Sequence, residues 1–184
     1  MNEYPKAINK IAISYLIFFI SINLGTLDCV PDWIGYWMIY NSLEIIAIYE
    51  KSVKLLKPLT IILIAYELII WLISAFGIVF DNYSISVLFA ALSLYFHYQL
   101  LTNLADIAQS HQCKQAKRIR QLRDVRTILS TIIVFPILWN TEIMIIYIAI
   151  ALIISIWLMR TLYTYSFDER MLVKQCQINT AMEN

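Results

Sequence analysis

The chain has 184 residues, of which 60% are hydrophobic and only 15% are charged, and its mean hydropathy is +0.68. A water-soluble domain normally carries about 25% charged residues, so this composition excludes an ordinary soluble fold and predicts an integral membrane protein. The net charge of +1 indicates no particular class of partner.

Apolar runs long enough to cross a hydrocarbon core of about 30 Å predict six transmembrane helices in a single bundle. The runs lack the polar and apolar alternation that strands of a membrane barrel require. In chain order, the predicted spans cover residues 8–24, 33–49, 59–80, 84–104, 127–139 and 143–159. We therefore expect an all-α integral membrane fold of three consecutive helical hairpins.

The junction between the first two runs reads NLGTLDCVPDWIGYW and contains two carboxylates, a proline and two glycines. We expect Asp28 and Asp32 to lie in an outer turn. Trp33, Tyr36 and Trp37 are then expected in the aromatic belt at the membrane interface. A turn explains most of these residues, and a ligand or partner site on the two aspartates is the alternative.

The distribution of charge predicts the orientation, because Lys and Arg accumulate on the cytoplasmic side of a membrane. With six spans and both termini in the cytoplasm, all 14 basic residues fall inside. The longest inner segment, residues 105–126, is a basic loop or a helical extension of the adjacent spans, and it carries no recognisable nucleic-acid-binding module. Its cationic side chains are expected to contact anionic lipid headgroups or a cytoplasmic partner. They are Lys114, Lys117, Arg118, Arg120, Arg123 and Arg126.

Three ionisable residues, Glu44, Glu67 and His97, lie inside predicted spans. A charge at mid-helix costs about 2.5–3.5 kcal/mol on insertion scales, so such residues usually face the interior of the bundle. Counted along the helices, the two carboxylates lie at similar depth, with His97 about one turn closer to the cytoplasm. Asn41 shares a helix face with Glu44, and Ser93 with His97. We predict a polar cluster that either handles a proton or cation, or pins the helices together by hydrogen bonds.

No motif typical of a hydrolase, a metalloenzyme or a phosphate-binding loop occurs in the sequence. We therefore predict no catalytic residue, metal or cofactor. The leading interpretation is a non-enzymatic membrane protein that serves as an accessory or small transport subunit, alone, as a homodimer or with a membrane partner protein. An intramembrane enzyme that acts on lipid is the alternative.

The segments INLGTLD and VPDWIGY resemble a signature of small multispanning membrane proteins of Gram-positive bacteria. The resemblance implies kinship with such proteins and no activity. We expect the chain to lie in a bacterial plasma membrane. The six-span architecture also resembles the substrate-binding S-components of energy-coupling-factor vitamin transporters, which implies a small-molecule-binding subunit of a transporter as a second alternative. This chain departs from that pattern, because its outer turns are short and Ala7 and Ala12 miss the AxxxA spacing expected in the first helix.

Overall fold

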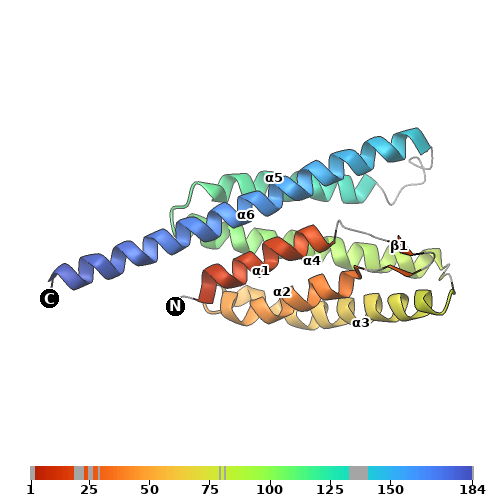
Figure 1. The fold of residues 1–184 in the computed structure, drawn as a ribbon, viewed down its shortest axis with the longest axis horizontal. Coiled ribbons are helices and arrows are strands. Elements are labelled where there is room, and N and C mark those ends of the chain that lie inside the picture. The colour runs from red at the N-terminus through yellow and green to blue at the C-terminus, as the bar shows by residue number, and fades with distance from the viewer. Residues whose placement is uncertain are drawn as a thin grey trace.

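The computed structural model describes residues 3–18, 23–24, 27–28, 30–78, 80, 82–132 and 141–183. These residues form an almost entirely helical protein, which confirms the predicted all-α class (Figure 1). The elements in chain order are α1 (Glu3–Ile17), β1 (Asn23–Leu24), β2 (Leu27–Asp28), α2 (Asp32–Ile46), η1 (Lys51–Leu55), α3 (Leu56–Ala75), α4 (Tyr83–Ser110), α5 (Gln115–Ile132) and α6 (Thr141–Glu183). The two short strands pair in antiparallel orientation, and η1 is a 3-10 helix.

Helices adjacent in sequence pack side by side, and α6 returns to pack against α1, so the bundle closes on itself. The chain runs back and forth along one long axis (Figure 1). The N-terminus, η1 and the turn between α4 and α5 lie at one end of this axis. The strand pair, the end of α3 and the start of α4 lie at the other end. This arrangement follows the order of the predicted hairpins.

Three segments in the described part of the chain are long and apolar enough to cross a membrane: Lys51–Ala75, Tyr83–Ser110 and Ile145–Glu169. The shortest has 25 residues, about 37 Å of helix, which exceeds the roughly 30 Å of a hydrocarbon core. Large apolar side chains on these helices point outward, for example Ile69, which is 54% exposed, and Ile153, which is 62% exposed. Such an apolar exterior is compatible with a lipid environment.

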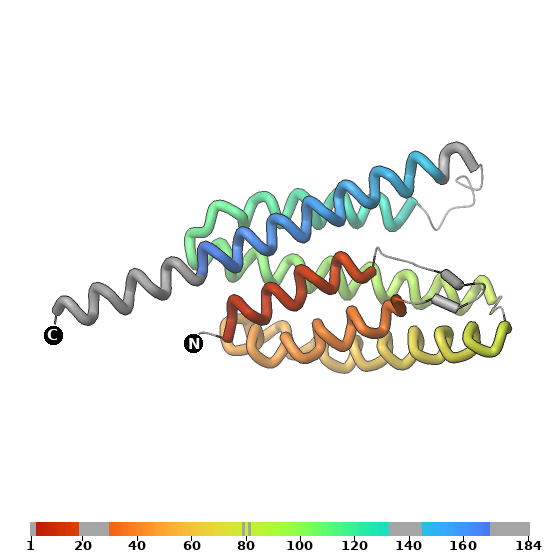
Figure 2. The backbone as a smooth tube through the Cα atoms, in the orientation of Figure 1, coloured from red at the N-terminus to blue at the C-terminus, as the bar shows by residue number. Residues whose placement is uncertain are grey.

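The other three predicted spans have no counterpart of this kind among the described residues. α1 and α2 have 15 residues each, about 22 Å of helix, which is shorter than the hydrocarbon core. α3 and α4 extend beyond them along the long axis (Figure 2). α5 contains the first part of the predicted span 127–139, but it begins within the basic segment, and residues 133–139 lie outside the described residues.

The basic segment 105–126 is helical except for one short turn. α4 continues to Ser110, and α5 begins at Gln115 after a turn in which Gln112 has a positive φ of 57°. Apolar side chains on both sides of this turn, Ile107 and Ile119, are buried in the core. The segment is therefore part of the bundle. Its packing fixes which of its arginines face inward.

Candidate functional site

A cavity of about 290 Å³ lies where α1 ends and α2 begins, and α3, α4 and α5 complete its walls. The α4 wall runs from Ser86 to His97, about 16 Å along the helix. Ser86, Ala90, Ser93 and His97 share one face of α4 because they are spaced by four, three and four residues, and all four line the cavity. The small side chains on this face leave room for a ligand between the helices.

His97 is held at the cavity by two tyrosines from other helices. Its side chain is buried, with Nδ1 3.2 Å from the Tyr15 hydroxyl and Nε2 3.4 Å from the Tyr36 hydroxyl. The Tyr36 hydroxyl also lies 2.7 Å from Ser93 Oγ. A neutral imidazole has one donor and one acceptor nitrogen, so the two tyrosines take opposite roles at the ring. The result is a chain of polar groups that links α1, α4 and α2.

Aromatic rings surround the imidazole on several sides. The ring centroids of Tyr15, Phe18, Tyr36 and Phe96 lie between 5.1 and 5.7 Å from that of His97. These contacts restrict the rotamer of the histidine and orient both of its nitrogens. Tyr15 and Tyr36 belong to the apolar runs of the first two predicted spans, and Tyr36, which is only 3% exposed, packs inside the bundle.

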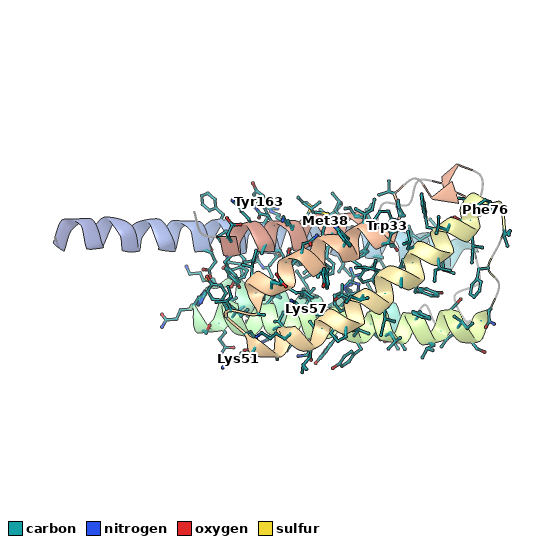
Figure 3. The ribbon with its side chains drawn as sticks, turned by 90° about the horizontal axis from the view of Figure 1, so that it is seen from below. Trp33, Met38, Lys51, Lys57, Phe76 and Tyr163 are labelled. Carbon is teal, nitrogen blue, oxygen red and sulfur yellow. The ribbon has the colours of Figure 1, made fainter. Side chains whose placement is uncertain are left out.

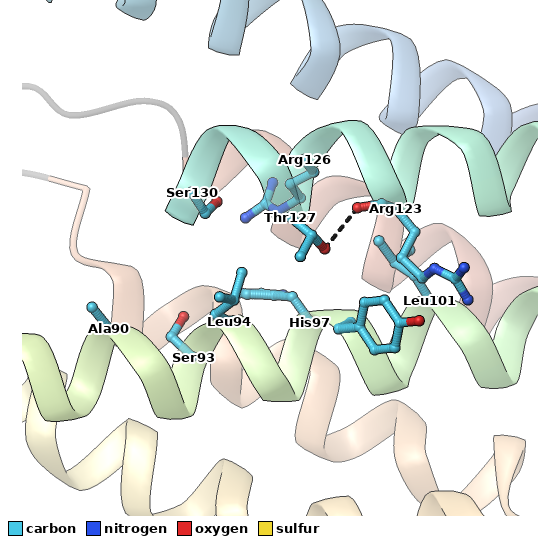
Figure 4. A pocket seen from close by; sticks show the side chains of 10 residues that line it. Ala90, Ser93, Leu94, His97, Leu101, Arg123, Arg126, Thr127 and Ser130 are labelled. Atoms are coloured by element: carbon cyan, nitrogen blue, oxygen red, sulfur yellow. Dashed lines mark hydrogen bonds between the residues drawn. The ribbon is translucent and has the colours of Figure 1, made fainter. Parts of the chain in front are cut away.

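Arg126 supplies a cation to the same cavity. Its guanidinium carbon lies 4.9 Å from the centroid of the Tyr15 ring, within the range of a cation–π contact. Arg126 also borders two smaller hollows, one between α4 and α5 and one between α5 and α6. Figure 4 shows Arg126 and Ser130 on α5 facing Ser93 and His97 on α4. Arg126 is therefore turned toward the other helices of the bundle, and its expected contact with lipid headgroups or a cytoplasmic partner stays a prediction.

The inward position of Arg126 follows from the periodicity of α5. Arg126 lies four residues after Leu122 and seven after Ile119, both of which are buried, so the three share one helix face. The inward orientation of Arg126 could therefore have been predicted from the spacing of apolar residues in the sequence. A count of basic residues does not reveal it.

Glu67 on α3 lines the cavity from another side. It lies four residues after Leu63 and seven after Thr60, which are both buried, and this places it on the inner face of α3. Asp32, in the first turn of α2, also lines the cavity. Among the described residues, no ion pair joins Glu67 to Arg126 or to any other basic side chain. Glu67 and Arg126 therefore face one cavity without an ion pair between them.

The prediction that Glu44 and Asn41 belong to the buried cluster is wrong. Both residues are exposed, and Glu44 Oε1 lies 2.6 Å from Lys57 Nζ with 74% of the glutamate side chain exposed. The reason is the length of α2, which ends at Ile46 and so places Glu44 in its last turn beside the start of α3. Figure 3 shows Lys57 toward the end of α3 that follows η1, the 3-10 helix that begins at Lys51.

The two aspartates of the predicted outer turn, Asp28 and Asp32, lie in different elements. Asp28 belongs to β2, where it is the backbone partner of Asn23, and its side chain lies outside the described residues. Asp32 is the first residue of α2 and lines the cavity, and its place in an outer turn stays a prediction.

The remaining basic residues of the 105–126 segment divide into two groups. Arg120 forms an ion pair with Asp106 at 2.7 Å, and Arg123 donates a hydrogen bond of 2.8 Å to Thr102 and lies 4.5 Å from the centroid of the Tyr98 ring. Both arginines therefore attach α5 to α4. The three that stay exposed are Lys114, Lys117 and Arg118.

A second polar cluster lies at the end of the bundle that holds the N-terminus. Glu169 on α6 is 5% exposed, and its Oε1 atom lies 2.7 Å from His111 Nδ1 and accepts a 3.5 Å hydrogen bond from the Cys113 thiol. Burial and the neighbouring Glu169 carboxylate raise the pKa of Cys113 to about 12, so the thiol is neutral at physiological pH. Tyr4 and Tyr165 are joined nearby through their hydroxyls at 2.8 Å. This cluster fastens α6 to α1 and to the α4–α5 turn.

Comparisons with protein-family models, with curated proteins and with solved structures find no significant match. Within the described residues, no group of three or more His, Cys, Asp or Glu side chains is placed to hold a metal ion. The described side chains that line the cavity offer a guanidinium, carboxylates, hydroxyls and an imidazole. These groups are suited to binding a small, charged, polar molecule.

Proposed function

We propose that this protein is a small membrane transporter, or the solute-binding subunit of one, and that its solute occupies the cavity bordered by Glu67, His97 and Arg126. The observation that carries the proposal is the position of Arg126, which lines the cavity without an ion-pair partner among the described residues. Removal of a charge from water costs several kcal/mol unless a counter-charge replaces the lost hydration. A bound solute that supplies this counter-charge explains why the cation is retained inside the bundle.

The proposal includes the orientation expected from the sequence, with both termini in the cytoplasm of a bacterium. The exposed residues Lys51, Lys54 and Lys114 support it, because they belong to η1 and to the α4–α5 turn at the end of the bundle that holds the N-terminus. In this arrangement α3, α4 and α6 cross the whole bilayer. The shorter α1 and α2 reach from the cytoplasmic side to the depth of the cavity, and α5 completes the bundle.

The volume of the cavity favours a small solute over a vitamin or a lipid. Its volume of about 290 Å³ lies at the lower edge of the roughly 300–1,000 Å³ that is typical of sites for drug-sized ligands, which disfavours a vitamin or a lipid. Ala7 and Ala12 are each only 1% exposed, so they are not available as a surface for a partner helix of the kind that an S-component uses. Both observations count against the S-component and lipid-enzyme interpretations.

Accessibility of the cavity tests the proposal. Ser93→Cys, in a variant without the three native cysteines, should react with a small membrane-impermeant thiol reagent in intact cells, because Ser93 lines the cavity. Leu100→Cys is the matched control, since Leu100 lies one heptad further along α4 and is fully buried. We expect rapid labelling at position 93 and none at position 100. Equal labelling at the two positions, or none at either in cells and in inverted vesicles, would refute the proposed function.

A further inference from the structure

We infer that the solute of this cavity is a small zwitterion that carries one carboxylate and one ammonium group, as an α-amino acid does. This inference rests on the proposed function, because it names the chemical class of the solute bound at the same site. Two opposite charges line the walls of the cavity, Arg126 on α5 and Glu67 on α3.

Arg126 is suited to hold the carboxylate. A guanidinium presents five N–H donors in a planar fork that matches the two oxygens of a carboxylate. Tyr15 lies 4.9 Å from the guanidinium carbon and supports it through the face of its ring, which leaves N–H groups at the edge of the guanidinium able to donate. No carboxylate of the described residues forms an ion pair with Arg126. A bound anion can therefore supply the counter-charge to Arg126.

Glu67 is suited to hold the ammonium. Its carboxylate borders the same cavity as Arg126, and within the described residues it forms no ion pair. Asp32 borders the cavity as well, and the hydroxyls of Tyr36 and Ser93 are available as acceptors for the other ammonium hydrogens. A plain anion would pair Arg126 and leave Glu67 desolvated, whereas a plain cation would do the reverse. A zwitterion compensates both charges at once.

The space between these groups limits the size of the zwitterion. The cavity of about 290 Å³ also has an apolar wall, in which the rings of Tyr66 and Phe89 stack in parallel with their centroids 3.6 Å apart. Phe18 contributes a third aromatic side chain. These rings favour an apolar or small side chain on the zwitterion over a long charged one.

Matched ligands test the inference on the purified full-length protein in detergent micelles. Isothermal titration would compare L-alanine, L-leucine and L-phenylalanine with the carboxylic acid and the amine that each becomes when its amino group or its carboxylate is removed. We expect at least one amino acid to bind about 10- to 100-fold more tightly than either counterpart, because a charge-assisted contact is lost each time.

Two variants assign the charges, and each has a matched control. Arg126→Gln should weaken binding of the amino acid about 10- to 100-fold, whereas Arg118→Gln, on the exposed surface of the same helix, should not. Glu67→Gln should weaken it similarly, whereas Glu44→Gln should not. Because Arg126 is half-buried and forms no ion pair with a described residue, Arg126→Gln should lower the thermal midpoint of the unliganded protein only by the small loss of its contact with the Tyr15 ring. This readout separates a binding role from a structural one.

The outcomes of the two experiments distinguish the two proposals. Binding of a deaminated or decarboxylated counterpart as tightly as its amino acid would overturn the zwitterion. If Ser93→Cys is labelled as expected but none of the three amino acids binds, the zwitterion is overturned and the proposed function stands. Failure of the labelling experiment would overturn both.

Discussion

Gly35 occupies a position on α2 where a single methyl group should change the packing of the cavity wall. A Cβ atom added there would lie 2.6 Å from Cε1 and 2.8 Å from Cζ of Phe18. Carbon atoms pack favourably at about 3.5–4.0 Å, so the phenyl ring would have to move by about 1 Å. It has little freedom to do so, because its centroid lies 4.6 Å from that of Tyr36 and 5.1 Å from that of His97.

The free energy of unfolding should change in a direction that depends on Phe18. Overpacking of this kind costs about 1–3 kcal/mol, whereas Ala in place of Gly within a helix gains about 0.5–1 kcal/mol. We therefore expect Gly35→Ala to destabilise the protein by about 1–2 kcal/mol. In a Phe18→Ala background the steric clash is absent, and the same substitution should stabilise the protein by about 0.5–1 kcal/mol.

Unfolding of the four proteins of this cycle in mixed detergent micelles, with increasing sodium dodecyl sulfate, would measure both effects. Gly77→Ala is the control, because Gly77 has a φ of 75° and no atom within 4 Å of an added Cβ. It should cost about 1–2 kcal/mol through the backbone alone, in either background. If Gly35→Ala had the same effect with and without the phenyl ring, within about 0.5 kcal/mol, the packing of Phe18 on α2 would be disproved.

Three further predictions concern the end of the bundle that holds the N-terminus. His111→Asn and Glu169→Gln should be non-additive by about 1–3 kcal/mol in detergent unfolding, because each removes one side of the same 2.7 Å contact, and additive losses would exclude that contact. Burial raises the pKa of Cys113 to about 12, so in a variant with Cys113 as its only cysteine the rate of reaction with iodoacetamide should rise about tenfold per pH unit up to pH 10. An ordinary thiol has a pKa of about 8.5 and levels off above pH 9, so a plateau there would contradict the raised pKa. Glu44→Gln should leave the thermal midpoint unchanged, because the Glu44 side chain is 74% exposed beside Lys57, and a clear loss would place it in the interior.

The sequence alone determines the helical class and three of the membrane-compatible segments. Apolar runs of this length indicate helices because a helix satisfies its backbone hydrogen bonds internally, and this is a property of each segment by itself. The polar face of α4 is local in the same way, because Ser86, Ala90, Ser93 and His97 need only the helical repeat to share it.

Glu44 and Arg126 show where a count of residues along the chain is insufficient. Glu44 lies in an apolar run and Arg126 in a basic one. An estimate from the boundaries of these runs therefore predicts that Glu44 is buried and that Arg126 is exposed. The structure reverses both positions. α2 ends at Ile46 and leaves Glu44 in its last turn, and the rotation of α5 turns Arg126 inward with Leu122.

The surroundings of His97 were decided only by tertiary structure. The residues whose hydroxyls contact it, Tyr15 and Tyr36, are separated from it by 82 and 61 positions in the chain. Hydrophobic periodicity indicates which face of a helix is buried, but it contains no information on which other helix that face meets. The partners of His97, and the placement of Arg126 and Glu67 around one cavity, depend on helix lengths and packing that involve the whole chain.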